Sequence, residues 1–137
     1  MDVDYKITKD VSADDVIQLL AEEGVSWLGT DTSWVEPSLR GAYCFVGAYW
    51  NGRLIGMAQA LSDTSSHAYV HQVIVSKSVR GKGVGKKMVS MLLDYLQEQG
   101  IDWIRLICDP ELEEFYGDLR FKKTEELVMI YEAPEKS

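Results

Sequence analysis

The sequence predicts one mixed α/β (α+β) domain, because stretches with the two-residue period of strands alternate with stretches of helical period. Its 137 residues suit a single packed core. No Pro-, Gly- or Ser-rich linker divides the chain, and no internal repeat is visible. We therefore expect one domain over residues 1–137, with residues 133–137 as a loose tail.

The first half of the chain predicts a strand, a helix and a hairpin. Asn51-Gly52 is the strongest short hairpin signal, because both residues tolerate the positive φ of a tight turn. Ser12 is a typical helix start, and Gly24 is a suitable helix end. The expected elements are a strand over 3–7, a helix between Ser12 and Gly24, a long connection or short irregular helix over 25–41, and strands over 42–50 and 53–61.

The second half predicts four more strands and two helices. Apolar residues recur every three or four positions after residue 84, which indicates a helix that ends at Gly100. Asp109 and Pro110 favour the start of a short helix that continues through Tyr116. The expected strands cover residues 68–75, 103–108, 121–124 and 127–132, and the second of them should be buried.

Charge is distributed unevenly along the chain. The net charge is −8, yet residues 77–87 contain five basic residues and no acidic one, so the other 126 residues carry −13. An acidic body of this kind repels polyanions, so we expect no nucleic-acid partner. A short basic loop fits a small ligand with several phosphates better.

Cysteine usage and hydropathy exclude several other classes of protein. Cys44 and Cys108 lie in apolar runs without CxxC spacing, which predicts buried free thiols and no metal site. No apolar run approaches the ~20 residues that cross a bilayer, and residues 1–10 are polar and acidic. We therefore expect no membrane partner and a cytoplasmic location.

The most informative stretch is a strand, a glycine-rich basic loop and the start of a helix over residues 73–87. A Walker loop would need a glycine at position 80 and Ser or Thr at position 87, which hold Arg80 and Lys87. A GxGxxG dinucleotide motif also fails, because neither possible register has its third glycine. What remains is Arg80-x-x-Gly83-x-Gly85.

This pattern resembles the [QR]xxGx[GA] motif of the GNAT superfamily, the Gcn5-related N-acetyltransferases. Residues 54–56, Leu-Ile-Gly, resemble the family's third strand, and Phe115-Tyr116 with Phe121 resembles its FYxxLGF ending. Arg120 stands where that ending usually has glycine. The resemblance implies the GNAT acyl-CoA N-acyltransferase fold, which is a mixed, mostly antiparallel sheet with helices on both faces and a V-shaped splay between strands four and five.

The resemblance also implies acetyl-CoA as a co-substrate, without a metal. Small residues at a helix N-terminus let backbone N–H groups and the helix dipole hold a pyrophosphate. Asp109 has an equally good structural explanation as a helix N-cap. The implied cofactor-binding residues are Val73, Ile74, Val75, Arg80, Gly81, Lys82, Gly83, Val84, Gly85, Lys86 and Asp109.

Two side chains are candidates for proton transfer. Tyr116 matches the family's tyrosine and is the candidate acid for the departing thiolate, although it also suits an aromatic anchor. On strand parity His71 shares a face with Val73 and Val75, unless a bulge intervenes. His71 resembles the strand-four histidines of the arylalkylamine acetyltransferase branch, which help to move the proton. It could equally be a structural histidine whose hydrogen bonds are satisfied in the core or at the surface. The family's oxyanion donor corresponds to the Val73 N–H.

These observations predict an N-acetyltransferase that moves an acetyl group directly from acetyl-CoA to a primary amine, with a small cationic amine favoured by the acidic body. The alternatives are a non-catalytic acyl-CoA-binding or regulatory module and an acetyltransferase for protein amines. A homodimer is also compatible with the sequence. Residues that could line the acceptor side, or merely pack or face solvent, are Glu22, Trp27, Asp31, Trp34, Glu36 and Asp63.

Overall fold

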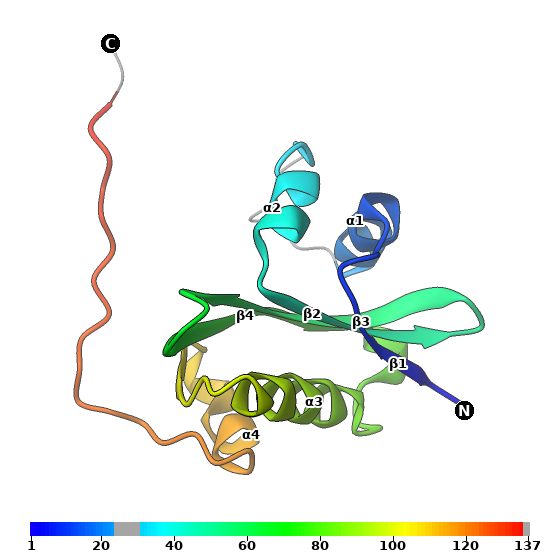
Figure 1. Ribbon diagram of the computed structural model, residues 1–137. Helices are drawn as coiled ribbons and strands as arrows, with labels where there is room; N and C mark the ends of the chain where they lie inside the picture. The colour runs from blue at the N-terminus through cyan, green and yellow to red at the C-terminus, as the bar shows by residue number, and fades with distance from the viewer. Residues whose placement is uncertain (24–30, 136–137) are drawn as a thin grey trace.

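The computed structural model describes residues 1–23 and 31–135, and its centre is a sheet of five strands (Figure 1). The spatial order of the strands follows the chain. The first four strands pair antiparallel, whereas the fifth pairs parallel with the fourth. The strands are β1 (Asp4–Ile7), β2 (Cys44–Trp50), β3 (Arg53–Ser62), β4 (His67–Val75) and β5 (Trp103–Leu106). The predicted mixed, mostly antiparallel sheet is confirmed.

Helices cover both faces of the sheet, as predicted. They are α1 (Ala13–Glu22), α2 (Val35–Gly41), α3 (Val84–Glu98) and α4 (Glu113–Gly117), with the 3₁₀ turns η2 (Lys77–Val79) and η3 (Pro110–Leu112). Figure 1 shows α1 and α2 above the sheet and α3 and α4 below it. One apolar core lies against α3 and the other against α1 and α2. None of the helices in the described ranges is long and apolar enough to cross a membrane.

Local signals in the sequence explain most element boundaries. The Ser12 hydroxyl accepts a hydrogen bond from the Asp14 N–H at 3.2 Å and caps α1. Asn51 and Gly52 have φ values of 52° and 77°, which identifies the predicted hairpin turn. The ambiguous region 25–41 ends as the helix α2. Gly24, predicted to end α1, lies outside the described residues.

Gly56 of β3 lies under the Met88 side chain, where α3 packs on the sheet. A Cβ atom at this position would lie 2.9 Å from the terminal carbon of Met88. The Leu-Ile-Gly stretch of β3 therefore lets the helix approach the strand.

The C-terminal region differs from the prediction. Residues 121–124 and 127–132 form no strands, and the chain after α4 is extended and separate from the sheet (Figure 1). The expected loose tail therefore begins well before residue 133. The prediction that residues 103–108 form a buried strand is also wrong, because β5 is an edge strand and Trp103 is 54% exposed. Alternating apolar residues indicated strands but not whether a partner lies beside them.

Candidate functional site: a cleft between β4 and β5

β4 and β5 diverge and open a cleft between them. The parallel pairing runs only from His67 opposite Trp103 to Val70 opposite Leu106, although β4 continues to Val75. The cleft has a volume of about 1210 Å³. Its walls are the second half of β4, the loop that enters α3, residues 106–109 and α4. This is the V-shaped splay that the sequence resemblance implied.

The end of β4 presents backbone groups to this cleft. The Ser76 N–H donates to the Ile55 carbonyl of β3 at 2.8 Å. Because backbone groups alternate in direction along a strand, Val75 and Val73 direct their N–H and C=O groups away from β3. The Arg80 Nε already donates to the Val75 carbonyl at 3.2 Å. The Val75 N–H and the backbone groups of Val73 therefore face the cleft.

The glycine-rich loop has the backbone conformation that only glycine adopts without strain. Gly81 and Gly83 both have φ of 80°, and no atom lies within 4 Å of the position of a Cβ on either. The first α-helical bond of α3 runs from the Lys87 N–H to the Gly83 carbonyl, at 3.1 Å. The N–H groups of residues 84–86 precede this bond and have no acceptor within the helix. They form a ready anion site with the dipole of a 15-residue helix behind it.

Gly85 has a packing role beside this anion site. A Cβ here would lie 3.3 Å from the ring of Phe115 in α4 and 3.4 Å from Val75 Cγ2. Glycine thus lets α3 approach both walls of the cleft. Phe115 has no role in the sequence prediction beyond the family ending, yet it lines the cleft at this point.

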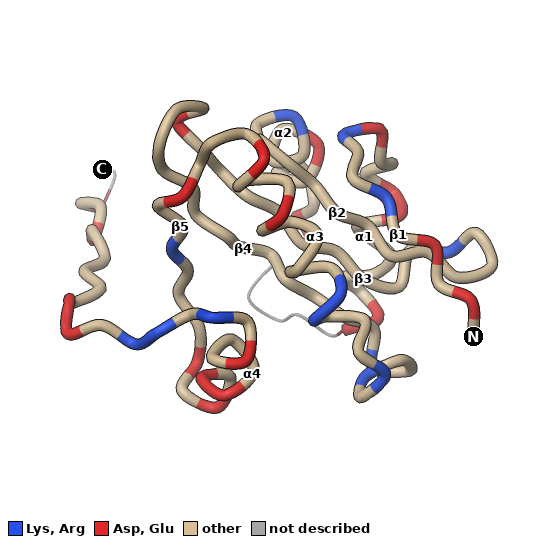
Figure 2. The backbone as a smooth tube through the Cα atoms, turned by 60° about the horizontal axis from the view of Figure 1, so that its bottom comes forward, with Lys and Arg blue, Asp and Glu red and all other residues tan. Residues whose placement is uncertain are grey.

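The positive charges of the loop surround the start of α3 (Figure 2). Lys82 and Lys87 are exposed. Lys86 Nζ forms an ion pair with Asp118 Oδ2 at 3.0 Å, which ties α3 to the end of α4. Lys82 and Lys87 can therefore attract phosphates, whereas Lys86 also has a structural partner.

Tyr116 lies at the opposite wall and is 7% exposed. Its ring packs edge-to-face against Phe115 and Phe121, with centroids 4.9 Å and 5.8 Å away. Burial, with a smaller contribution from Cys108, raises the pKa of the phenol above its ordinary value. Tyr116 is therefore a neutral hydrogen-bond donor at neutral pH, held by aromatic packing. Both interpretations of this residue fit its surroundings.

His71 also lines the cleft, but the predicted strand parity is wrong. A bulge in β4 places Gln72 at φ 55°, and the pairing with β3 shifts between Met57 and Gln59. Val73 and Val75 consequently pack in the core against α3, whereas His71 lies on the other face, beside Tyr69 with ring centroids 5.7 Å apart. An extra residue in one strand leaves no mark on sequence periodicity.

The His71 imidazole has an unsatisfied nitrogen. Its Nε2 is buried without a hydrogen-bond partner among the described residues, and the Oε1 atoms of Gln59 and Gln72 are in the same condition. Gln59 lies directly opposite His71 in β3 and is 2% exposed. Burial lowers the pKa of His71, which favours the neutral imidazole. His71 and Gln72 line the cleft, where a bound ligand could supply a missing partner, whereas Gln59 is buried beside it.

A comparison with known proteins covers both the core of the fold and the glycine-rich loop. The sequence profile of the acetyltransferase (GNAT) family matches residues 13–117, which include β4, the glycine loop and α4. The chain belongs to the GNAT family. Tyr116 and the loop thus lie inside the matched region, whereas the extended C-terminal region lies outside it.

Two relatives show similarity over half of the chain. It is 37% identical over 68 residues to an uncharacterized N-acetyltransferase ycf52 of Gracilaria tenuistipitata var. liui, covering 50% of the chain and 37% of that relative. It is 39% identical over 70 residues to histone acetyltransferase TAP1 of Glycine max, covering 51% of the chain and 30% of that relative. The matched part is therefore only about a third of each relative.

Solved structures share the fold over nearly the full chain. The GNAT-family protein SP0256 of Streptococcus pneumoniae superposes with a TM-score of 0.83 at 19% identity, covering 98% of this chain and 100% of the other. The probable acetyltransferase SA2161 of Staphylococcus aureus has a TM-score of 0.79 at 24% identity, covering 95% and 100%. These similarities show the fold alone.

The arginine of the GNAT motif has an intramolecular partner that the sequence did not predict. Arg80 Nη2 forms an ion pair with Glu23 Oε2, just beyond α1. The other oxygen of Glu23 accepts the Lys77 N–H at 2.8 Å, and this side chain is only 3% exposed. Arg80 therefore fixes the loop to α1 and to Val75 as well as contributing positive charge. Glu23 gives no signal in the sequence, because it is 57 residues from its partner.

Asp109 and Cys108 lie on the β5 wall of the GNAT cleft. Asp109 occupies the N-cap position of η3, where its carbonyl accepts the Leu112 N–H at 2.9 Å, but its side chain makes no capping bond. The Asp109 side chain therefore does not make the expected capping bond, and the residue lines the cleft. Cys44 is buried as predicted, whereas Cys108 is partly exposed. Burial and nearby carboxylates raise the pKa of the Cys108 thiol, so it is protonated at neutral pH.

The carboxylates proposed for the acceptor side have local partners. Glu22 binds Arg53, and Glu36 binds Arg40 at 2.9 Å. Asp31 accepts the Ser33 N–H, and Asp63 accepts three N–H groups at the turn before β4, which lowers its pKa well below the usual range. Trp34 packs against the core beside α1 and α2. Trp27 lies outside the described residues.

Proposed function

We propose that the protein is an acetyl-CoA-dependent N-acetyltransferase that acts directly on a primary amine. The observation that carries the proposal is the single cleft that joins the anion site of the GNAT loop to Tyr116 and His71. A ternary complex requires this arrangement, because donor and acceptor must meet in one site. Cys108 does not favour a covalent route, since burial and nearby carboxylates raise the pKa of its thiol and so disfavour the nucleophilic thiolate.

The residues of the cleft fit acetyl-CoA. The open space around Gly81 and Gly83 and the free N–H groups of residues 84–86 would hold the pyrophosphate. The backbone groups of Val73 and Val75 would pair with the amides of the pantetheine arm. When bound, acetyl-CoA supplies the activated acetyl thioester. Lys82 and Lys87 would add long-range attraction for its phosphates.

Three groups in the cleft between β4 and β5 would transfer protons or stabilise charge during the reaction. The Tyr116 hydroxyl would donate a proton or hydrogen bond to the leaving sulfur, which requires a neutral phenol, and the raised pKa of Tyr116 keeps it neutral. The Val73 N–H would stabilise the oxyanion. The neutral His71 imidazole would take a proton from the amine, directly or through water.

The acceptor would enter from the face of the sheet that carries His71 and Gln59. The Gln59 Oε1 is a buried acceptor without a partner among the described residues, and it suits an amine N–H. The excess of acidic residues outside the loop favours a cationic amine. We therefore favour a small cationic primary amine over an anionic one such as glutamate.

A thiol-release assay with acetyl-CoA tests this function directly. The acceptor panel should span polyamines, arylalkylamines, amino sugars, amino acids and basic peptides. We expect turnover with a cationic member and a rate that rises as pH passes the pKa of His71. A Gln59→Leu variant should raise KM for the amine, whereas Gln97→Leu on the exposed side of α3 should not. Acetyl-CoA binding without turnover of any acceptor would instead indicate a non-catalytic module.

Protein amines are the second candidate acceptor. One similar protein is named a histone acetyltransferase, which favours a basic peptide within the same panel. The acidic body attracts a lysine-rich segment for the same reason that it attracts a small amine. A lower KM for a basic peptide than for free lysine would support this candidate, and equal values would exclude a peptide-binding surface.

A further inference from the structure

Cys108 places a thiol on the β5 wall of the cleft. It is partly exposed, whereas the other cysteine, Cys44, is buried in the core against α3. A thiol that lines a ligand cleft differs from one packed in a core, because it can meet the sulfur atom of a ligand. The acetyl-transfer chemistry makes no use of Cys108. The cleft therefore contains a reactive group whose role is still open.

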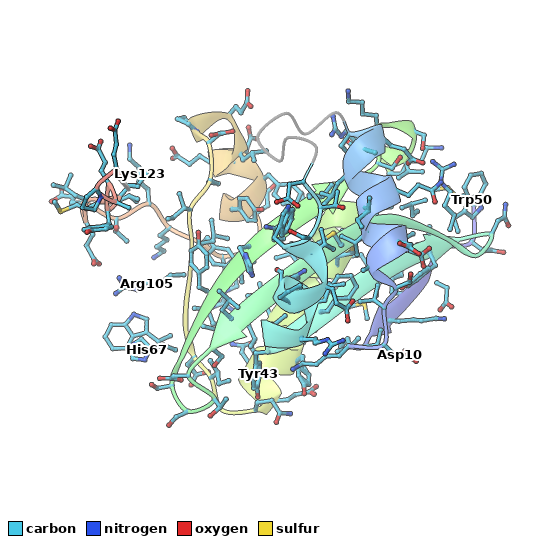
Figure 3. All side chains as sticks on the ribbon, turned by 90° about the horizontal axis from the view of Figure 1, so that it is seen from above. Asp10, Tyr43, Trp50, His67, Arg105 and Lys123 are labelled. Atoms are coloured by element: carbon cyan, nitrogen blue, oxygen red, sulfur yellow. The ribbon has the colours of Figure 1, made fainter. Side chains whose placement is uncertain are left out.

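Cys108 follows the point where β4 and β5 separate. Figure 3 labels His67 of β4 and Arg105 of β5, which belong to the part where the two strands are still paired. The last pair is Val70 opposite Leu106. Cys108 comes shortly after this pair, on the strand that turns away from β4. It thus lies on the inner end of the splay and not at its mouth.

The position of Cys108 along the cleft is that of the reacting groups. Parallel strands advance by the same rise per residue, so Cys108 lies at the level of His71 and Gln72 across the splay. It is also close enough to Tyr116 for the charge of its ionised thiol to contribute to the raised pKa of the phenol. The proposed function places the sulfur of acetyl-CoA at Tyr116. Cys108 therefore lies beside the expected position of a second sulfur atom.

The same end of the cleft contains polar groups without partners. Tyr116 is 7% exposed, and its hydroxyl makes no hydrogen bond to another described residue. His71 Nε2 and Gln72 Oε1 are buried and also lack a partner in the described part of the chain. All three residues line the cleft together with Cys108. Buried donors and acceptors are normally satisfied, so a ligand that reaches this end would supply the missing partners.

We propose that Cys108 is a modification site that forms a mixed disulfide with CoA, and that the co-reactant is CoA disulfide. The inference rests on the proposed function, because it needs CoA in the cleft. The Cys108 thiol loses its proton to solvent, and its sulfur attacks the sulfur of the bound half. The bond between the two CoA sulfurs breaks, and a bond from Cys108 to the bound CoA forms. The other CoA leaves as a thiolate that takes up a proton, so no further oxidant is required.

The surroundings of Cys108 make the reaction depend on binding in the cleft. Burial, Asp109 and Glu113 raise the pKa of the thiol, so little thiolate is present at neutral pH. Disulfides in free solution should therefore react slowly with Cys108. A disulfide held by the loop is presented at a high effective concentration, which offsets the small thiolate fraction. The adduct would fill the cleft and stop acetyl transfer until a reductant releases CoA.

Intact-mass spectrometry of the full chain with two disulfides tests this modification. CoA disulfide and glutathione disulfide share the reactive bond, but only the first carries the pyrophosphate that the loop would hold. At equal concentrations we expect CoA disulfide to react about tenfold faster, and an excess of acetyl-CoA to suppress the reaction. Peptide mapping should locate the adduct at Cys108. Cys108→Ala should form no adduct, whereas Cys44→Ala is the matched control and should react as the natural chain does.

Calorimetric titration of the same protein with acetyl-CoA separates this inference from the proposed function. Binding of acetyl-CoA together with an unmodified Cys108 would overturn the inference alone. Equal rates with the two disulfides would overturn it as well, and so would a reaction that acetyl-CoA does not suppress, because Cys108 would then react without the cleft. A chain that does not bind acetyl-CoA would overturn the proposed function itself.

Discussion

The two walls of the cleft are built differently. On the loop wall, backbone groups do the binding, and their geometry follows from Gly81, Gly83 and the N-terminus of α3. On the acceptor wall, the polar atoms belong to side chains. His71 lines the cleft, Gln59 is buried beside it in β3, and His71 Nε2 and Gln59 Oε1 lack partners among the described residues. The comparison teaches that the cofactor site is already formed by the backbone, whereas the acceptor site is recognised by side-chain atoms that lack hydrogen-bond partners.

The largest expected effect is on the loop wall. Gly83→Asp places a carboxylate at the anion site, and we expect acetyl-CoA affinity to fall about 100-fold, or ~3 kcal/mol. Gly100→Asp is the matched control, because Gly100 also has φ of 80° with open space around it but lies at the other end of α3. Calorimetric titration measures both. Equal affinities in the two variants would place the pyrophosphate elsewhere.

The next effect tests the chemistry between the walls. Tyr116→Phe should lower kcat by about 100-fold while the affinity for acetyl-CoA stays unchanged, because the hydroxyl acts mainly in the transition state. Tyr95→Phe is the control, since Tyr95 packs at the opposite end of the core, against Tyr43 with ring centroids 6.3 Å apart. Full activity in Tyr116→Phe would make this residue an aromatic anchor only.

A smaller effect tests how rigidly the loop wall is held. Glu23→Gln removes the charge that fixes Arg80, so the loop should lose order and acetyl-CoA should bind about tenfold more weakly, or ~1.4 kcal/mol. Glu22→Gln changes the adjacent residue, whose partner Arg53 lies in the hairpin strand β3 and not in the loop. Tighter binding in Glu23→Gln would mean that Glu23 competes with the phosphates for Arg80.

The smallest effect concerns the acceptor wall. The pKa of His71 is lowered by burial, so between that value and about 6.5 only the unfolded chain binds the proton. The free energy of unfolding should therefore fall as pH drops through 6.5, and His71→Gln should remove this part of the loss. Urea unfolding at pH 7.5 and 5.5 measures it, with the exposed His67→Gln as control. An unaltered pH dependence would contradict a buried neutral imidazole.

Signals that act over a few residues made much of this structure predictable. Asn51-Gly52 specified a turn, Gly83 a helix start and Gly100 a helix end, because each requires a positive φ. The GNAT resemblance then identified the cleft. Arg120 also has a positive φ, of 75°, although it is not glycine. It stands where the family ending usually has glycine, so the backbone conformation is kept although the residue type has changed.

The remaining features depend on contacts between distant residues. The bulge at Gln72 inverts the face of His71 relative to Val73, and strand periodicity cannot reveal an inserted residue. The pairing of Glu23 with Arg80 joins two elements that only the fold brings together. Residues 127–131 have a strand sequence, but whether a strand forms depends on a neighbour beside it.

Amide hydrogen exchange of the full chain with and without acetyl-CoA tests the central claim most directly. If acetyl-CoA binds between β4 and β5 through the start of α3, the amides of Val73, Val75 and residues 83–86 should become protected. Those of β2, on the far side of β3, should stay unchanged. Binding that leaves the amides of residues 73–75 and 83–86 unprotected would contradict this account of the cleft.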